Sequence, residues 1–513
     1  MGEYSRGIQN PAQDSGERGW GRRKVSGLSV SVAMQGSDER LGDVVTDGEK
    51  VDPAAGIVNP RLSDVFGLVI RQDEVDFVVP HLREDLPLYL DPFLLWKSDD
   101  PEYQRLHADL LGFVDEVRKH AADGRATRAR MLLSEVSEPV ELGLGYAAGT
   151  KRGSALGPGT IDGIVRTFQQ VPQLQAAGLD HLEVLSLLVP GIAEDRISDL
   201  TASVIKRWLT EFTERRCEDW GIPTTPRRLL GWDAAALDWR PFDARLPHNP
   251  SDGSPVLLAP LNLLRRLPWI NYGDYYRTAY APLVLPPGRT GRTVAKQDVL
   301  AYNRAHFDTV CGYVTEREAA AAACAPDPLF TPLRLATVKK KVSEIKALPT
   351  GRSDGADKKF EELAFDVLSS VLYPELDLAG QQERTISGAH IRDVIFHNDG
   401  KTPFLTDLRD QYGARQLVFE LKNVAELDTE HVNQLYRYLD DEDMGRFGVL
   451  VARNPPKTRV QRNIVDLHSS KRRAVLCLDD SDLDLMVALL DSGRRPIEAL
   501  RKKHVEFTRR LPK

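Results

Sequence analysis

The sequence predicts a mostly α-helical N-terminal domain followed by an α/β C-terminal domain. The chain has 513 residues, more than one hydrophobic core usually serves. Helical spacing of apolar residues dominates from Pro60 to about Ala320, whereas beyond residue 356 helices alternate with short apolar strands. We therefore expect at least two domains, and one function need not cover the whole chain.

Composition places the chain among ordinary globular proteins. Hydrophobic residues make up 42% and charged residues 28% of the sequence. The first residues are polar, and no later stretch reaches the roughly 18 apolar residues that span a bilayer. The four cysteines are scattered without a CxxC spacing, which favours neither a disulfide framework nor a thiolate zinc site. We expect a cytoplasmic protein with no membrane partner.

The N-terminal part contains three kinds of sequence pattern. Residues 1–57 lack any periodicity and are predicted to be a disordered tail. Residues 58–330 form the predicted helical domain, in which crowded prolines and tryptophans between Thr224 and Pro287 indicate loop-rich structure. One apolar stripe at helical spacing is predicted to be core: Ile197, Leu200, Val204, Ile205, Trp208 and Phe212. This domain would sense a trigger, grip a substrate, or hold a partner protein or a second copy of the chain.

A linker over 331–355, containing a short basic helix, is predicted to precede a C-terminal domain over 356–513. The expected helices cover 358–373 and 429–441, and the expected strands cover 383–387, 391–396, 417–421, 447–452 and 474–478. The last two strands are continuous apolar runs, which are typical of central strands covered on both faces.

The residues expected to carry chemistry lie at the end of the strand over 417–421. The strand period of two places Glu420 and Lys422 on the same face. The acid-x-Lys pattern also occurs at 344–346 and 357–359, but there in helical or loop contexts, whereas Glu420 follows a strand that offers Asp393 in an apolar run. Buried carboxylates are costly unless they are paired or bind a metal, so we predict a cation site. The alternative is a half-exposed salt bridge.

Two neighbouring helices add polar candidates. Glu361 and Glu362 follow Phe360 on the helix that precedes the strands, and Gln434 and Tyr438 share one face of the helix over 429–441. Glu361 and Glu362 have a plainer interpretation as a solvated helix flank, and the pair of Gln434 and Tyr438 would mean little alone.

Taken in order, the Phe-Glu helix, the strand aspartate, Glu-x-Lys and Gln-x-x-x-Tyr resemble the PD-(D/E)XK nuclease superfamily, particularly its Mrr-type restriction endonuclease branch. The resemblance covers about residues 356–480. It implies a restriction-endonuclease-like fold, in which helices flank a central mixed sheet.

The resemblance also implies a role for each candidate. Asp393, Glu420 and Glu361 would ligate Mg²⁺, with Mn²⁺ as a substitute, Lys422 would position the attacking water, and Gln434 and Tyr438 would brace the site. Glu361 is favoured over Glu362 because Phe360 fixes the register of the family pattern. The sequence departs from the family in having Arg392 before the strand aspartate, where proline is frequent.

The implied function is a Mg²⁺-dependent endonuclease that acts on nucleic acid, with double-stranded DNA as the expected substrate and restriction or antiviral defence as the expected role. That role rests on analogy, because one fold supports many functions. The alternative is a non-catalytic nucleic-acid-binding or scaffold protein that retains the fold.

A basic stretch from Arg494 to Arg510 is a further candidate for contact with DNA, because lysine and arginine near phosphates favour binding. Glu498 and Glu506 interrupt it, so a solvated helix face is the alternative.

Overall fold

The computed structural model describes residues 60–83, 85–144, 155–285, 294–384, 391–439 and 445–512, apart from the side chains at 378–384, 391–393, 438 and 471. The predicted tail over 1–57 lies outside these residues. Two separate hydrophobic cores are present in the described chain, one between Leu62 and Cys324 and the other between Val338 and Phe507. No helix of the described part is both long and apolar enough to cross a membrane.

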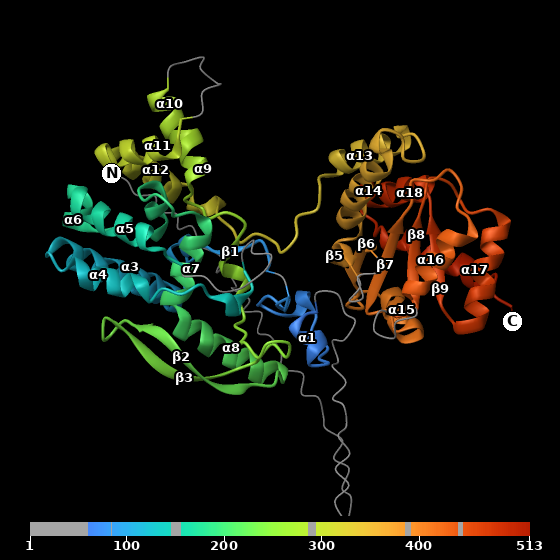
Figure 1. The fold of residues 1–513 in the computed structure, drawn as a ribbon, viewed down its shortest axis with the longest axis horizontal. Coiled ribbons are helices and arrows are strands. Elements are labelled where there is room, and N and C mark those ends of the chain that lie inside the picture. Colours follow the sequence, from blue (N-terminus) through green and yellow to red (C-terminus); the bar gives the residue numbers. More distant parts are fainter. Residues whose placement is uncertain are drawn as a thin grey trace, which may run out of the picture. The chain divides into compact units, whose positions relative to one another are not determined.

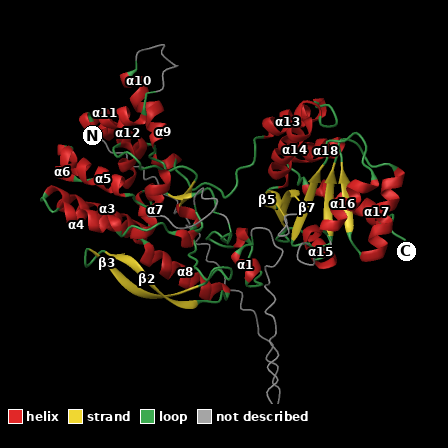
Figure 2. Ribbon diagram, in the orientation of Figure 1, coloured by secondary structure: helices red, strands yellow, loops and turns green. Residues whose placement is uncertain are grey.

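The first core is built from helices with two small two-stranded sheets (Figures 1 and 2). The α-helices are α1 Leu62–Val65, α2 Pro92–Trp96, α3 Pro101–Ala122, α4 Ala126–Ser134, α5 Pro158–Gln170, α6 Pro172–Ala177, α7 Glu194–Val204, α8 Lys206–Trp220, α9 Tyr272–Tyr275, α10 Ala281–Val284, α11 Lys296–Ala305 and α12 Phe307–Ala319. The strands are β1 Tyr89–Leu90 paired with β4 Leu264–Arg265, and β2 Thr225–Asp233 paired with β3 Asp238–Leu246.

The predicted apolar stripe is buried at all six positions, but it belongs to two helices instead of one. Helix α7 ends before Ile205, whose backbone leaves the helical range at φ −86°, ψ 12°, and α8 begins directly after it. Because the break at Ile205 is short, both helices face the same core. The helical spacing of the apolar residues therefore continues across it.

The hairpin β2–β3 falls in a region that we predicted to be irregular. The strands pair over nine residues, from Thr225 opposite Leu246 to Asp233 opposite Asp238. Pro226 and Pro241 concealed it in the sequence, because proline interrupts most strand patterns. In a two-stranded sheet each strand has a free edge, where proline is tolerated.

Two buried acids face each other in the first core. Asp91 is 1% exposed, and its carboxylate accepts hydrogen bonds from the backbone N–H groups of Phe93 and Trp269 at 3.1 and 2.8 Å. Glu183 is 0% exposed. Burial and the neighbouring Asp91 raise the pKa of Glu183 well above its usual range, and burial raises the pKa of Asp91 to about 6.

Glu183→Gln is expected to weaken the pH dependence of stability in the N-terminal region. A carboxyl group whose pKa is raised on folding stabilises the protein at low pH, and this contribution is lost as the pH rises through the folded-state pKa. Each such group contributes a slope of up to about 1.4 kcal/mol per pH unit. All seven tryptophans precede residue 270, so urea unfolding followed by tryptophan fluorescence between about pH 5 and pH 8 reports this region. An unchanged slope in the variant would contradict the prediction.

The second core surrounds a five-stranded sheet in the order β5-β6-β7-β8-β9 (Figure 1). The β5–β6 and β6–β7 pairs are antiparallel, whereas β7–β8 and β8–β9 are parallel, so the sheet is mixed. Its strands are β5 Asp377–Arg384, β6 Ile391–His397, β7 Gln416–Leu421, β8 Phe447–Val451 and β9 Ala474–Leu478. Its helices are α13 Leu335–Ala347, α14 Ala356–Leu372, α15 Pro403–Tyr412, α16 Thr429–Tyr438, α17 Thr458–Lys471, α18 Asp480–Asp491 and α19 Ile497–Thr508.

Most predicted elements of this domain lie within a few residues of the observed ones. The exceptions are β5, which begins six residues before the predicted strand over 383–387, and α15, which lies where no helix was predicted. Residues 385–387 of the predicted strand lie outside the described residues. Thr402 caps α15 through its Oγ1, which accepts from Leu405 N at 3.3 Å. The short basic helix of the predicted linker is α13, which buries Val338, Val342 and Ile345 in the second core.

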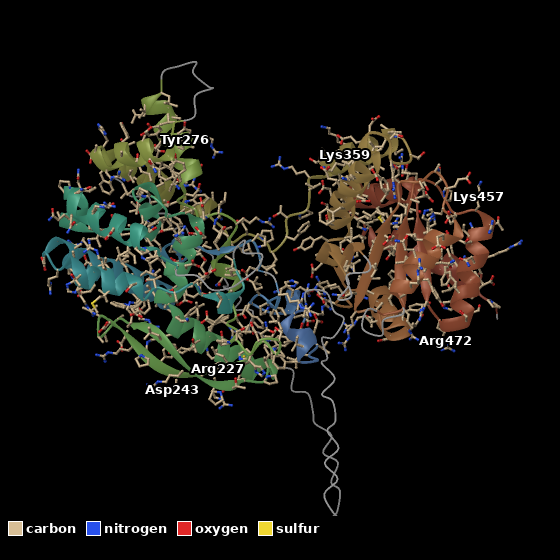
Figure 3. All side chains as sticks on the ribbon, viewed as in Figure 1. Arg227, Asp243, Tyr276, Lys359, Lys457 and Arg472 are labelled. Carbon is tan, nitrogen blue, oxygen red and sulfur yellow. The ribbon has the colours of Figure 1, made fainter. Side chains whose placement is uncertain are left out.

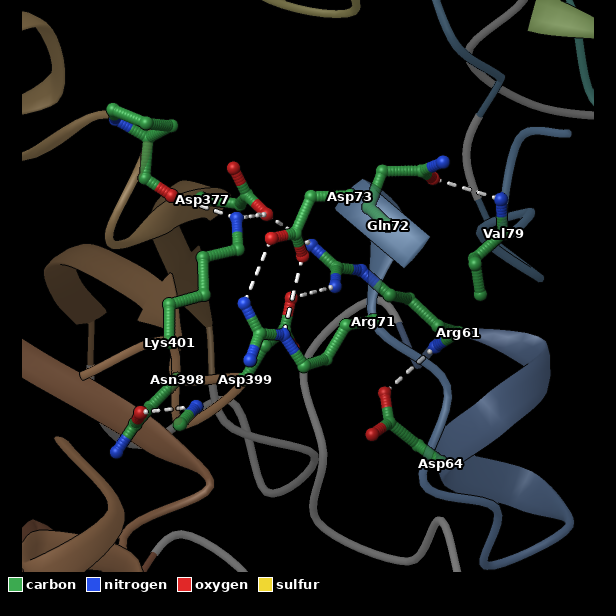
Figure 4. Close-up of polar contacts among 12 residues, drawn as sticks. Arg61, Asp64, Arg71, Gln72, Asp73, Val79, Asp377, Asn398, Asp399 and Lys401 are labelled. Atoms are coloured by element: carbon green, nitrogen blue, oxygen red, sulfur yellow. Dashed lines mark hydrogen bonds and ion pairs between the residues drawn. The ribbon is translucent and has the colours of Figure 1, made fainter. Parts of the chain in front are cut away.

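A polar cluster joins the segment around α1 to the loops beside β5 and β6 (Figure 4). The Arg61 guanidinium is largely buried and pairs with Asp399 at 2.7 Å and with Asp377 at 3.2 Å. Lys401 pairs with the same Asp377 carboxylate at 3.1 Å. Asp399 follows the carboxyl end of β6, which lies beside the amino end of β7 because these strands are antiparallel. This cluster is therefore at the opposite sheet edge from Glu420.

Candidate active site

Glu420 and Lys422 meet at the carboxyl end of β7. Strand β7 is buried along its whole length, and Glu420 is 1% exposed. The Lys422 ammonium lies 2.6 Å from Glu420 Oε1, and 22% of the Lys422 side chain is exposed. The backbone N–H of Lys422 donates to Val451 O at 2.8 Å, which fixes the lysine beside the end of β8. The accessible part of this ion pair is therefore the lysine.

Asp393 lies on β6, next to the residues that pair with β7. Val394 is opposite Phe419 and Ile395 is opposite Val418 in the antiparallel register. Continued by one residue, this register sets position 393 opposite position 420. The side chain of Asp393 lies outside the described residues.

Helix α16 covers the sheet face that carries Glu420. Leu435 of α16 lies over Gly448, where an added Cβ would come within 3.1 Å of the leucine side chain. Leu450 shares a face with Gly448 because residues two apart on a strand point the same way. Leu450 is also the partner of Glu420 in the β7–β8 register. Glu420 and α16 are therefore on the same side of the sheet.

The remaining predicted site residues are placed by their helices. Gln434 is half-buried on α16 and directly precedes Leu435, and Tyr438 ends the same helix with its side chain outside the described residues. Glu361 is half-buried on α14, directly after the fully buried Phe360, and α14 packs against β5 and β7. Of the six predicted residues, the structure thus brings Glu420 and Lys422 into direct contact.

A buried polar network beside this pair was not predicted. Asn423 Nδ2 donates to Gly351 O at 2.9 Å, and its Oδ1 accepts from Arg453 Nη1 at 3.2 Å. Arg453 Nη1 also donates to Leu348 O at 2.9 Å, while its Nε lies 3.0 Å from Asp480 Oδ2. Burial raises the pKa of Asp480, and the Arg453 guanidinium opposes that shift. The network ties the segment before α14 to the ends of three strands.

These three polar residues follow a sequence pattern from which the site could have been predicted. Asn423, Arg453 and Asp480 each stand two residues after the last residue of β7, β8 and β9. Carboxyl ends of parallel strands meet at one edge of a sheet, where open α/β folds commonly place their sites. Polar residues immediately after each apolar run therefore mark the same edge as Lys422.

The described side chains do not by themselves form a complete metal site. Across the described chain, no three histidine, cysteine, aspartate or glutamate side chains gather closely enough to hold a metal ion. The Asp393 side chain lies outside these described residues. Glu420 supplies a buried carboxylate, which is the hard oxygen ligand that Mg²⁺ prefers.

Two comparisons with known proteins each match part of the chain, and neither match names an activity. A family model described as a domain of unknown function, DUF8370, matches residues 67–271. These residues belong to the N-terminal helical region and exclude Glu420 and Lys422. The transposon gamma-delta 80.3 kDa protein of Escherichia coli (strain K12) is 29% identical over 123 residues, which are 24% of this chain and 17% of that protein. The chain thus spans less than a fifth of the length of this relative. No solved structure matches the chain.

Proposed function

We propose that the C-terminal domain is a Mg²⁺-dependent endonuclease of the PD-(D/E)XK type, with Glu420 and Lys422 at its centre. The observation that carries this proposal is a buried carboxylate held 2.6 Å from a partly exposed lysine at the end of a central strand. The antiparallel β5–β6–β7 strands followed by parallel β8 and β9 also agree with the mixed sheet that the sequence resemblance implies.

The proposed metal fits the residues at this edge. Mg²⁺ is usually bound by one or two protein carboxylates, together with water and substrate phosphate, and does not need an all-protein cage. Glu420 would be one ligand, and Asp393 would be the second from the neighbouring position in the β6–β7 register. Glu361 would support the metal shell from α14. When bound, the cation neutralises charge that develops on the phosphate and activates water.

The chain's own groups would position the reactants. The Lys422 ammonium, as the exposed member of the ion pair, would meet the scissile phosphate first and would orient the attacking water. The Arg453–Asn423 network would keep the end of β7 in place, because both side chains are buried and hydrogen-bonded. Gln434 and Tyr438 would brace the site from α16, which covers the same sheet face as Glu420.

Double-stranded DNA is the proposed substrate, and restriction or antiviral defence in the cytoplasm is the proposed role. The partial similarity to a transposon protein favours DNA, since transposons are DNA elements. The helical N-terminal region would recognise a trigger, a partner or a second copy of the chain. A non-catalytic nucleic-acid-binding protein is the second candidate, because the Glu420–Lys422 pair could serve only as a structural ion pair.

The proposal is tested by incubating the full chain with double-stranded DNA, single-stranded DNA and RNA, each with Mg²⁺, with Mn²⁺ or with EDTA. Cleavage of double-stranded DNA that requires the divalent ion is the expected result. Binding without cleavage under every metal condition would favour the second candidate.

A further inference from the structure

The charges of this chain are unevenly distributed. The whole chain has a formal net charge of −7, yet residues 457–473 contain six lysines or arginines against one acid. Residues 494–510 contain seven against two. These two segments include α17 and α19, so positive charge is concentrated on two helices of the C-terminal domain.

The two helices are neighbours that run in opposite directions. Arg510, just after α19, donates from Nη1 to Gln461 Oε1 near the start of α17 at 3.0 Å. Further along α17, the ring of His468 lies 5.2 Å from that of Phe507, centroid to centroid. Both helices bury apolar residues beneath this contact, namely Val460 and Ile464 from α17 and Leu500 and Phe507 from α19.

The basic side chains point outward from this pair of helices. We use the name basic surface for the exposed residues Arg459, Arg462, Arg472, Lys502 and Arg509. Within the described part of the chain, none of the five takes part in an ion pair. Figure 3 labels Lys457 and Arg472, which lie at opposite ends of α17. These positive charges are thus not neutralised by neighbouring acids and are available to a partner.

The basic surface is continuous with the candidate active site. Lys457, which precedes α17, pairs with Glu426 at 2.5 Å, and Asn454 Nδ2 donates to Ala425 O at 2.9 Å. Both contacts attach the start of α17 to the loop that follows Lys422. Lys503 of α19 pairs with Asp482 at 2.7 Å, beside the end of β9. One end of the basic surface therefore lies at the sheet edge that carries Lys422.

We propose that the basic surface binds the sugar-phosphate backbone of double-stranded DNA and leads the duplex to the Glu420–Lys422 edge. The proposal rests on the proposed function for its substrate. Helix α17 is about 20 Å long, which matches about six phosphates of one strand at about 3.4 Å each. Exposed cationic side chains on two neighbouring helices thus suit an extended row of phosphates.

The test uses the full chain carrying Glu420→Gln, so that binding is measured without cleavage. Arg459→Gln, Arg462→Gln, Lys502→Gln and Arg509→Gln are combined in one variant. A matched control combines Arg83→Gln, Arg105→Gln, Arg215→Gln and Arg240→Gln, which are exposed arginines of the N-terminal region. Affinity for a 30-base-pair duplex, and for single-stranded DNA and RNA of the same length, is measured over a range of salt concentrations by fluorescence anisotropy. Circular dichroism and thermal melting confirm that the variants fold like the parent.

The plot of log K against log salt is expected to lose up to about 0.9 in slope for each phosphate contact removed, or about 3.6 for four. The control is expected to keep the parental slope. The inference is overturned if the parent does not bind the duplex, if the control loses as much slope as the basic-surface variant, or if the loss is seen with single-stranded DNA or RNA but not with the duplex.

This result is separable from the nuclease proposal. If the basic-surface substitutions weaken duplex binding while the wild type cuts nothing with Mg²⁺, the inference stands and the nuclease proposal fails. If the wild type cuts duplex DNA and the substitutions leave both binding and cutting unchanged, the nuclease proposal stands and the inference fails.

Discussion

Lys422→Met is expected to lower the rate of DNA cleavage by about 10²- to 10⁴-fold, the usual range for a positioned group that handles a proton or a water. The substitution keeps the apolar stem and removes the ammonium that lies 2.6 Å from Glu420 Oε1. Because the Glu420 carboxylate then loses its cationic neighbour, Mg²⁺ should raise the melting temperature of the variant more than that of the wild type. Single-turnover cleavage and thermal melting with and without Mg²⁺ measure both effects.

Lys346→Met is the matched control. Lys346 belongs to another acid-x-Lys triplet, but it lies on α13 and pairs with the exposed Asp484 at 2.7 Å. Its loss should leave cleavage unchanged. Equal activity of Lys422→Met and wild type would remove Lys422 from the mechanism.

Arg453→Met is expected to destabilise the C-terminal domain by about 3 to 5 kcal/mol, the cost of removing one partner from a buried ion pair. Arg453 is 7% exposed, and its guanidinium donates hydrogen bonds to Asp480, to Asn423 and to the carbonyl of Leu348. Methionine fills similar volume but leaves these three groups without their donor. The expected result is faster amide hydrogen exchange in β7 and β8.

Hydrogen exchange is the suitable measurement because all tryptophans lie in the N-terminal region and do not report this domain. Arg494→Met, at an exposed position, should change stability by no more than about 0.5 kcal/mol. If Arg453→Met exchanged no faster than the control, the network would not hold this edge of the sheet.

The sequence predicted the C-terminal domain well where burial and periodicity coincide. Strands β8 and β9 are continuous apolar runs, and the Glu420–Lys422 pair follows from strand alternation at the end of β7. Helix α15 was not predicted because the polar residues Thr406, Asp407 and Asp410 make its sequence resemble a loop. Its buried face is nevertheless apolar and consists of Phe404, Leu405, Leu408 and Tyr412. The polar composition of this segment hid the helical spacing of the apolar residues that pack into the core.

Contacts between residues far apart in the chain could not be predicted from the sequence. The link from Arg453 to Leu348 spans 105 residues, and that from Arg61 to Asp399 spans 338. Neither can be inferred from periodicity, which relates only neighbours on one element. The same limit applies to the basic surface, because the contact between α17 and α19 joins segments separated by β9 and α18. The C-terminal stretch also buries Leu500 and Phe507, so substitution of its exposed residues is a cleaner test than deletion.

The most direct test of the nuclease proposal compares the wild type and Glu420→Gln on supercoiled plasmid DNA with Mg²⁺. Glutamine keeps the shape of the buried side chain and removes the charge that would bind the cation. We predict nicking or linearisation by the wild type, abolished by EDTA, and a rate at least about 10²-fold lower for Glu420→Gln. Equal cleavage by both proteins with Mg²⁺ would contradict the assignment of Glu420 as the metal-binding carboxylate.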